Sequence, residues 1–150
     1  MRKYPTAVGI VSLSLFLAAG VAVLAITARN SSLDHEGRQF VSAAIPAIFT
    51  HWDERALISR ATTDLRAAVK DRELNGLFEG MSRQLGPLKG CKGIEGGASI
   101  SVEPDRGIVE SGEYLVRTRF AAGDADIRLS LVKDNNNWRI LSFRLDSDQF

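Results

Sequence analysis

The spacing of the hydrophobic residues changes after Pro87, and this change constrains the fold more than any other feature of the sequence. Before Pro87, apolar side chains recur every three or four residues, which is the period of one face of an α-helix. From Ala98 onward they recur at every second residue, which is the period of a strand that buries one face. The pattern therefore predicts an α+β domain in which helices come first and an antiparallel sheet follows.

The helical half of the chain is predicted to contain about three helical segments. The first should begin near Leu33 with Ser31 or Ser32 as its N-cap, and Pro46 inside it should produce a kink. Its apolar stripe consists of Phe40, Val41, Ala44, Ile45, Ile48, Phe49 and Trp52. A stripe of this width predicts a helix that packs one face against a core.

The next two helical segments have recognisable ends. The second is predicted to start at Thr62 or Thr63, because a threonine hydroxyl can accept a hydrogen bond from the first turn. The third should occupy residues 71–85 and stop at Gly86, since glycine accepts the left-handed C-cap and Pro87 cannot continue the helix. These signals place the end of the helical half at residue 86.

The triplet His51-Trp52-Asp53 lies where the first helix should end. Residues two apart on a helix do not face each other, so a helical His51 and Asp53 could not easily share a proton. Asp53 fits better as an N-cap, with Glu54 at the next position, of a short turn that carries the apolar residues 56–58, and Trp52 fits as a core residue. A pocket-lining or catalytic role for His51 or Asp53 is the alternative interpretation.

Four antiparallel strands are predicted after a glycine-rich loop at residues 89–97, with hairpin connections at residues 121–124 and 133–137. Ile100 and Val102 alternate with polar residues in the first strand, and Ile127, Leu129 and Leu131 should face inward in the third. In the second strand one face carries Tyr114, Val116, Thr118 and Phe120. The last strand breaks the alternation, so a β-bulge near Leu141 and Ser142 should bring its apolar residues onto one face. Such a bulge would also help the sheet to curve.

The N-terminal region contains an apolar run that predicts export. Residues 7–26 carry no charge, and the uncharged stretch extends from residue 4 to residue 28. Twenty helical residues span about 30 Å, the thickness of the hydrocarbon core of a bilayer. Because Arg2 and Lys3 precede the run, the positive-inside rule leaves the N-terminus in the cytoplasm and sends the remainder across.

The expected organisation follows from this run. Residues 1–6 form a cytoplasmic n-region, residues 7–28 a signal anchor or signal peptide, residues 29–37 a polar linker, and residues 38–150 the domain. The run is longer than the apolar region of most cleaved signals, which favours a retained anchor. The domain would then lie outside the cytoplasmic (inner) membrane and attached to it, whereas cleavage would make it periplasmic or secreted.

Composition argues against several classes of site. The lone Cys91 allows no disulfide within the chain, and His35 and His51 are far apart in the sequence, so neither a metal site nor a cofactor is expected. The 19 basic residues nearly balance the 18 acidic ones, and no basic run stands out. Nucleic-acid binding is therefore not expected.

The stretch from "HWDERAL" through "MSRQLGPLKG" to "WRILSFRLDS" resembles small exported bacterial domains of the nuclear transport factor 2-like superfamily, which has a cystatin-like fold. The matching positions are Trp52, Asp53, Leu85, Gly86, Trp138, Ile140 and Phe143, and the likeness covers about residues 38–147. The resemblance implies a cone-like arrangement in which a curved sheet closes over helices. It speaks to fold more than to chemistry, because the superfamily includes isomerases as well as members that only bind or assemble.

The absence of a recognisable catalytic constellation favours a non-enzymatic binding or assembly domain of unknown ligand. Arg117, Arg119 and Arg128 should cluster on the outer face of the sheet, a surface that related folds use for dimers. This face is therefore a candidate for a homodimer or for an anion site. The alternative is a solvated face on which Glu113 and Asp126 partly balance the arginines.

A small-molecule binder or an isomerase-like enzyme is the alternative function, and it would use a cavity between the helices and the sheet. The candidate pocket-lining residues are His51, Trp52, Asp53, Tyr114, Phe120, Trp138 and Phe143. The competing interpretation is that these aromatic residues fill the core, since a domain of this size needs their buried area for stability.

Overall fold

The computed structural model describes residues 29–148 and has helices followed by a four-stranded antiparallel sheet. A helix over residues 29–49, called the long helix below, precedes α2 (Glu54–Ile58), α3 (Thr63–Ala68) and α4 (Asp71–Leu85). The strands are β1 (Leu88–Glu103), β2 (Gly107–Phe120), β3 (Asp124–Asp134) and β4 (Asn137–Ser147), and each pairs with its neighbour in the sequence. The predicted α+β class and the four antiparallel strands are confirmed.

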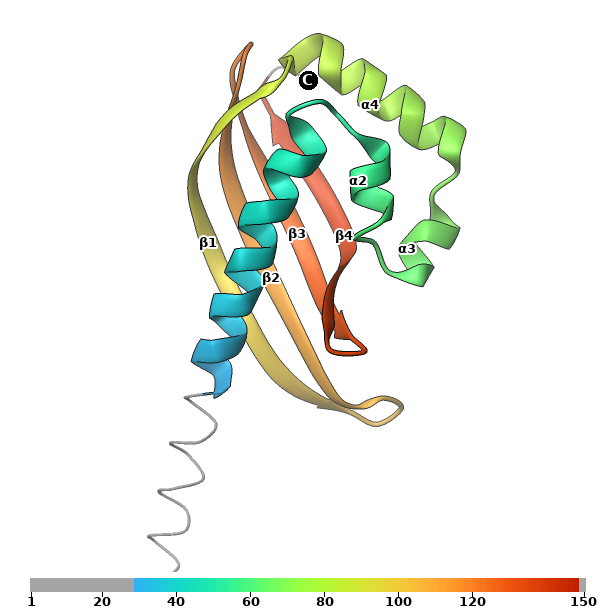
Figure 1. Cartoon of the computed structure of the whole chain (residues 1–150), viewed down its shortest axis with the longest axis vertical. Coiled ribbons are helices and arrows are strands. Elements are labelled where there is room, and N and C mark those ends of the chain that lie inside the picture. Colours follow the sequence, from blue (N-terminus) through green and yellow to red (C-terminus); the bar gives the residue numbers. More distant parts are fainter. Residues whose placement is uncertain (1–28, 149–150) are drawn as a thin grey trace, which may run out of the picture.

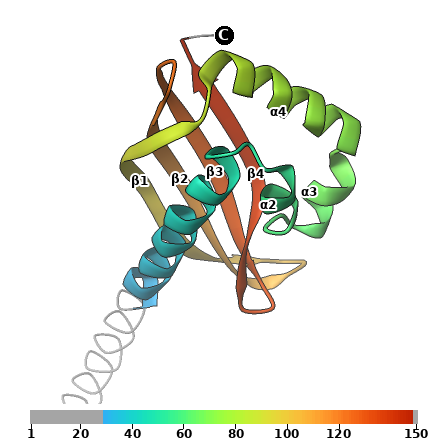
Figure 2. The ribbon, with the colours of Figure 1, turned by 45° about the horizontal axis from the view of Figure 1, so that its top comes forward.

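All four helices of the described chain lie on one face of the sheet (Figure 1). The long helix crosses that face, the strands bend around it, and α2, α3 and α4 lie toward the β4 side in both views (Figures 1 and 2). At the β4 edge, the Ile140 amide donates to the Arg60 carbonyl at 2.7 Å, and the Thr62 amide donates to the Ile140 carbonyl at 2.9 Å. The segment before α3 therefore covers part of an edge that would otherwise be open to another chain.

The long helix extends further toward the N-terminus than the sequence predicts. Residues 29–32 are already helical, so the prediction of a cap at Ser31 or Ser32 and of a linker over residues 29–37 is wrong. The physical reason is tertiary: Leu33 is only 3% exposed, and charged residues around it bond to the sheet. The helix also continues through Pro46, whose side chain is exposed.

The short segments after the long helix follow the predicted caps. The Asp53 carboxylate accepts hydrogen bonds from the Arg55 and Ala56 amides at the start of α2, and the Thr62 hydroxyl accepts one from the Leu65 amide at the start of α3. Helix α4 ends at Gly86, which has a φ of 71°. These caps fix the chain reversals that bring α4 back over the sheet.

The first strand corrects the prediction of a glycine-rich loop at residues 89–97. That segment belongs to β1 and pairs with β2, with register shifts between Leu88 and Gly90 and between Cys91 and Gly93. Its glycines are compatible with the sheet because bulges and close backbone approaches need a residue without a side chain. The glycine content of residues 89–97 suggests a loop, and their strand conformation follows only from their pairing with β2.

The predicted hairpins and bulge are confirmed. Asn135 and Asn136 both have positive φ, as a tight β3–β4 hairpin turn requires. Ser142 pairs with Ser130 and Ile140 pairs with Leu131, which leaves Leu141 as the extra residue of a bulge. Trp138, Ile140, Phe143 and Leu145 consequently all pack on the core side.

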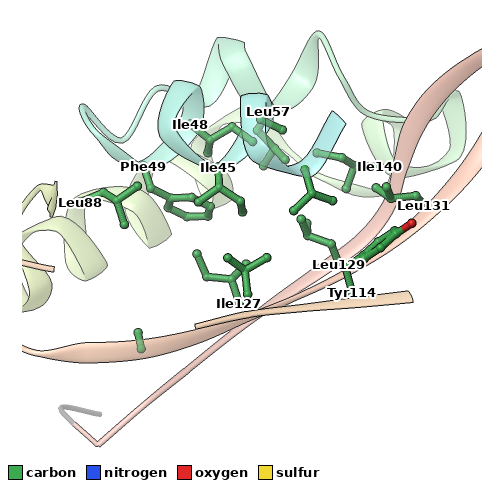
Figure 3. Packing of buried hydrophobic residues seen from close by; sticks show 14 of the residues in the cluster. Ile45, Ile48, Phe49, Leu57, Leu88, Tyr114, Ile127, Leu129, Leu131 and Ile140 are labelled. Atoms are coloured by element: carbon green, nitrogen blue, oxygen red, sulfur yellow. The ribbon is translucent and has the colours of Figure 1, made fainter. Parts of the chain in front are cut away.

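The core lies between the long helix and the sheet (Figure 3). Ile45 and Phe49 extend from the helix toward Ile127 and Leu129 of β3, and Ile48 and Leu131 belong to the same packed layer (Figure 3). Each of these six residues is 1% exposed or less. This packing holds the elements in the positions from which the candidate sites are built.

Candidate functional site

The predicted pocket-lining residues Trp52, Phe120 and Phe143 belong to one aromatic cluster with Phe49 and Phe78. The Trp52 ring stacks on Phe120 with centroids 5.4 Å apart and meets Phe49 edge-on at 5.3 Å. Phe78 lies 5.7 Å from Trp52 and 6.4 Å from Phe143. These rings contact one another at distances typical of aromatic pairs, so they pack against each other as part of the core.

Trp52 is held in place by its backbone and by its indole. Its φ is +52°, a left-handed conformation that ends the long helix and turns the chain into α2. The indole Nε1 donates to the Gly86 carbonyl at 2.8 Å, which joins this turn to the end of α4. The His51-Trp52-Asp53 triplet therefore has a structural role: Asp53 caps α2, and Trp52 joins the end of the long helix to the end of α4.

His51 is exposed and faces a surface hollow of about 330 Å³ beside the aromatic cluster. This hollow is lined by His51, Trp52, Glu54, Phe78, Glu79, Ser82, Gly86 and Pro87. Asp53 lines a neighbouring hollow with Arg55 and Asn75. The Glu54 carboxylate already accepts a hydrogen bond from Asn75 at 2.7 Å, and Glu79 pairs with Arg83 at 3.5 Å. The two carboxylates are thus partly occupied by their neighbours.

The remaining two predicted pocket residues lie elsewhere. Trp138 is 8% exposed, and its ring centroid lies 5.7 Å from the Lys133 ammonium. Tyr114 is 3% exposed and reaches the long helix near Asp34. The structure therefore does not gather the seven predicted residues into one pocket: three belong to the aromatic cluster, His51 and Asp53 line surface hollows, and Tyr114 and Trp138 lie beside charged groups of the sheet and the long helix.

Two polar clusters join the N-terminal half of the long helix to the sheet. In the first, called the Arg38 cluster, Arg38 donates to the carbonyls of Ile94 at 2.8 Å and Gly96 at 2.6 Å. The same guanidinium pairs with Asp34 at 2.9 Å, and the Tyr114 hydroxyl donates to the Asp34 carboxylate at 3.2 Å. Hydrogen bonds that involve a charged group are stronger than neutral ones, so this cluster fixes the helix to β1 and β2.

The second cluster, called the Lys133 cluster, includes Arg29, the first described residue of the long helix. The Lys133 ammonium is 2.6 Å from Glu36 and 3.6 Å from Glu110, and Glu110 also pairs with Arg29 at 2.7 Å. The side chains of Lys133 and Glu110 are only 11% and 15% exposed. The helix is thus tied to β2 and β3 as well as to β1.

These contacts shift the ionisation of the residues involved. The hydrogen bond from Lys133 lowers the pKa of Glu36, and the same bond raises the pKa of Lys133. Burial opposes ionisation of Asp34, yet the bond and charge of Arg38 together with the Tyr114 bond hold its pKa below the usual value. Burial first, and then the Asp34 charge, raise the pKa of Tyr114 to about 12.

The raised pKa of Tyr114 predicts a loss of stability at alkaline pH. A folded-state pKa above the unfolded value of 10 means that this contribution is complete below pH 10 and is lost as the pH rises toward 12. Two pH units correspond to about 2.7 kcal/mol, which is an upper figure for this group. We expect the free energy of unfolding of Tyr114→Phe to fall less steeply above pH 10 than that of the unchanged chain. Parallel curves in urea titrations from pH 9 to 12 would contradict the assignment.

The sequence-predicted arginines on the outer sheet face each have an acidic neighbour. Arg119 pairs with Asp124 at 2.7 Å. Arg117 lies 3.3 Å from Glu95, and Arg128 lies 3.4 Å from Asp146. Of the two acids predicted to balance these arginines, Asp126 lies directly opposite Arg117 in the β2–β3 register, and Glu113 accepts a hydrogen bond from Ser130 at 2.8 Å. The three arginines share a face, but their side chains are more than half exposed, so each pair contributes little to stability.

Comparison with protein-family models, curated proteins and solved structures finds no match to this chain. The resemblance to the nuclear transport factor 2-like superfamily consequently stays a prediction. Within residues 29–148, no helix is long and apolar enough to cross a membrane, and no three acidic, histidine or cysteine side chains are placed to hold a metal ion. The apolar run of residues 7–26 lies outside the described residues.

Sequence reasoning did not identify the two polar clusters. One local signal was present, because Asp34 and Arg38 are four residues apart and opposite charges at that spacing pair on a helix. The partners on the sheet, Ile94, Gly96 and Tyr114, are at least 56 residues away in the chain. Such contacts depend on how the layers are stacked, which periodicity does not specify.

Proposed function

We propose that this chain is an exported, membrane-anchored and non-enzymatic domain that binds or assembles with another molecule outside the cytoplasmic membrane. The observation that supports this most is the position of the long helix. It is already helical at residue 29, directly after the uncharged stretch of residues 4–28, and both polar clusters fix it to the sheet. A domain attached in this way would be held against the bilayer, whereas a flexible tether would let it move away.

The aromatic cluster favours binding or assembly over catalysis. An isomerase-like mechanism needs an apolar pocket into which several polar groups converge. Here Trp52, Phe120 and Phe143 pack against other rings, and Tyr114 is engaged with Asp34. The alternative function as a small-molecule binder would therefore have to use the open hollow beside His51.

The shape of the sheet supports, in addition, a cone-like fold of the nuclear transport factor 2-like type. The strands curve around the helices, and the bulge at Leu141 supplies a local bend in β4 (Figure 1). In this proposal the outer sheet face, which no described helix covers, is the surface for a partner such as a second copy.

Alkaline carbonate extraction of bacterial membranes tests the anchor. We expect the full chain to remain in the membrane pellet. A double variant with Leu15→Arg and Leu17→Arg should move to the supernatant, because a charge at the centre of a spanning helix costs about 2.5 to 3.5 kcal/mol. The matched control, Ser31→Arg with Ser32→Arg, adds the same charge at exposed positions outside the run and should stay in the pellet.

Two outcomes would correct the proposal. A shortened chain in the periplasmic fraction would show that the run is a cleaved signal, so that export holds and anchoring does not. An unchanged chain of full length in the cytoplasmic fraction would overturn both.

A further inference from the structure

Two large apolar side chains are exposed at the tip of the β1–β2 hairpin. Val102 is 79% exposed and Ile108 is 71% exposed, and the two residues pair directly across the hairpin. Directly paired residues project to the same side of a sheet, so they form one apolar surface, called the hairpin pair below. Lone exposed hydrophobic residues need no explanation, but a matched pair at a projecting tip suggests contact with something apolar.

The contacts of β2 place this pair at the N-terminal end of the long helix. Tyr114 of β2 bonds to Asp34, and Glu110, four residues earlier in β2, pairs with Arg29. Lower residue numbers in β2 therefore lie closer to the first residues of the long helix. Ile108 lies two residues further in the same direction, which is about 7 Å at the rise of a strand. In Figures 1 and 2 the β1–β2 turn and the start of the described helix both lie in the lower half of the molecule, on opposite sides of it.

The uncharged run of residues 4–28 ends directly before the first described residue of the long helix. Arg29 is the first charged residue after residues 4–28, so an anchor built from that run would place Arg29 at the outer boundary of the hydrocarbon core. The headgroup layer beyond that boundary is about 5 to 7 Å deep. An anchor that placed Arg29 at that boundary would bring the hairpin pair within reach of the membrane interface. Of the other large exposed hydrophobic residues in the described chain, Leu77 lies on α4, at the far end of the molecule, and Leu141 lies on β4 (Figure 1).

We infer that Val102 and Ile108 insert into the outer interface of the membrane and form a second contact of the domain with the lipid surface. This inference rests on the proposed anchoring. Two of the acidic groups near the tip are balanced, because Arg106 lies 3.7 Å from Glu103 and Arg29 is paired with Glu110, and Asp105 of the turn adds one further negative charge. One apolar pair binds a bilayer only weakly by itself, but the anchor keeps it at a high effective concentration beside the lipid.

Site-specific fluorescence of the full chain in vesicles tests this contact. Cys91→Ser removes the native thiol, and a single cysteine at position 102, 108 or 77 then carries an environment-sensitive nitrobenzoxadiazole dye. The vesicles contain phosphatidylethanolamine and phosphatidylglycerol, with or without lipids brominated on the acyl chains. We expect blue-shifted emission and loss of more than half of the intensity in brominated vesicles for Val102→Cys and Ile108→Cys, and little loss for the control Leu77→Cys.

Flotation of the labelled protein with the vesicles separates the two proposals. A chain that floats but is quenched equally at positions 108 and 77 overturns the lipid contact alone. A chain that does not float overturns the anchor and the lipid contact together. Blue-shifted emission that brominated lipid leaves unquenched, and that grows with the protein-to-lipid ratio, would assign the hairpin pair to a second copy of the chain and contradict the lipid contact. Labels at both 102 and 108 guard against a local effect of one substitution.

Discussion

Phe49→Ala should lower the free energy of unfolding by about 3 to 5 kcal/mol, the range for removing a large buried aromatic side chain. Phe49 is 1% exposed and contacts the rings of Trp52, Phe78 and Phe120, all within 6.2 Å. Its removal would leave a cavity where the long helix, α4 and β2 meet, and the surrounding rings cannot all move to close it. Urea titration of the detergent-solubilised full chain, followed by tryptophan fluorescence, measures the change because Trp52 lies in the affected cluster.

The matched control is Leu77→Ala on α4. Leu77 is 50% exposed, so its truncation should change the free energy of unfolding by only about 0.5 kcal/mol. If Phe49→Ala does not fold at all, Phe49→Leu provides a milder truncation with an intermediate loss. A loss for Phe49→Ala no larger than that of Leu77→Ala would mean that the aromatic cluster is not a packed core, and the cavity required by the alternative function would regain support.

Gly96→Ala should also be strongly destabilising, by about 3 kcal/mol, because strained backbone conformations cost of the order of 1 to 3 kcal/mol and a steric overlap adds to that cost. Gly96 has a φ of +103°, which side chains rarely accept, and a Cβ there would overlap the Glu113 carbonyl oxygen of β2. The Gly96 carbonyl also accepts a hydrogen bond from Arg38. The substitution is therefore expected to separate β1 from β2 locally and to loosen the Arg38 cluster.

Gly93→Ala is the control in the same strand. No atom lies within 4 Å of the Cβ that it would add, and its φ lies outside the left-handed region. We expect a change within about 0.5 kcal/mol for this variant. Hydrogen exchange gives a second measurement: Gly96→Ala should speed exchange of the long-helix amides near Asp34 and Arg38, and Gly93→Ala should not. Equal effects of the two substitutions would contradict the close approach of β1 to β2 at Gly96.

The sequence predicted those parts of the fold that depend on local signals. The cap at Asp53, the stop at Gly86 and the bulge at Leu141 each follow from the chemistry or the spacing of a few neighbouring residues. The alternation in β2 likewise predicted that Tyr114 and Phe120 point inward. These features are decided by backbone preference and by burial, both of which a single sequence carries.

The errors occurred where a distant contact outweighed a local preference. Residues 89–97 have the glycine content of a loop, yet their pairing with β2 makes them a strand. Residues 29–32 have a capping serine pair, yet contacts of the helix with the sheet extend it past them. The two polar clusters were missed for the same reason, since Lys133 and Glu36 meet only after the layers have stacked.

The central claim is that the domain lies outside the cytoplasmic membrane and is held there by the N-terminal run. The native thiol tests this directly, because Cys91 is the single cysteine of the chain and is exposed on β1. Intact spheroplasts that express the unmodified chain would be treated with a membrane-impermeant maleimide, and the labelled protein would then be recovered from the membrane fraction. The account predicts that Cys91 is labelled as fully in intact spheroplasts as after lysis. Labelling that requires lysis would place the domain inside and contradict the account.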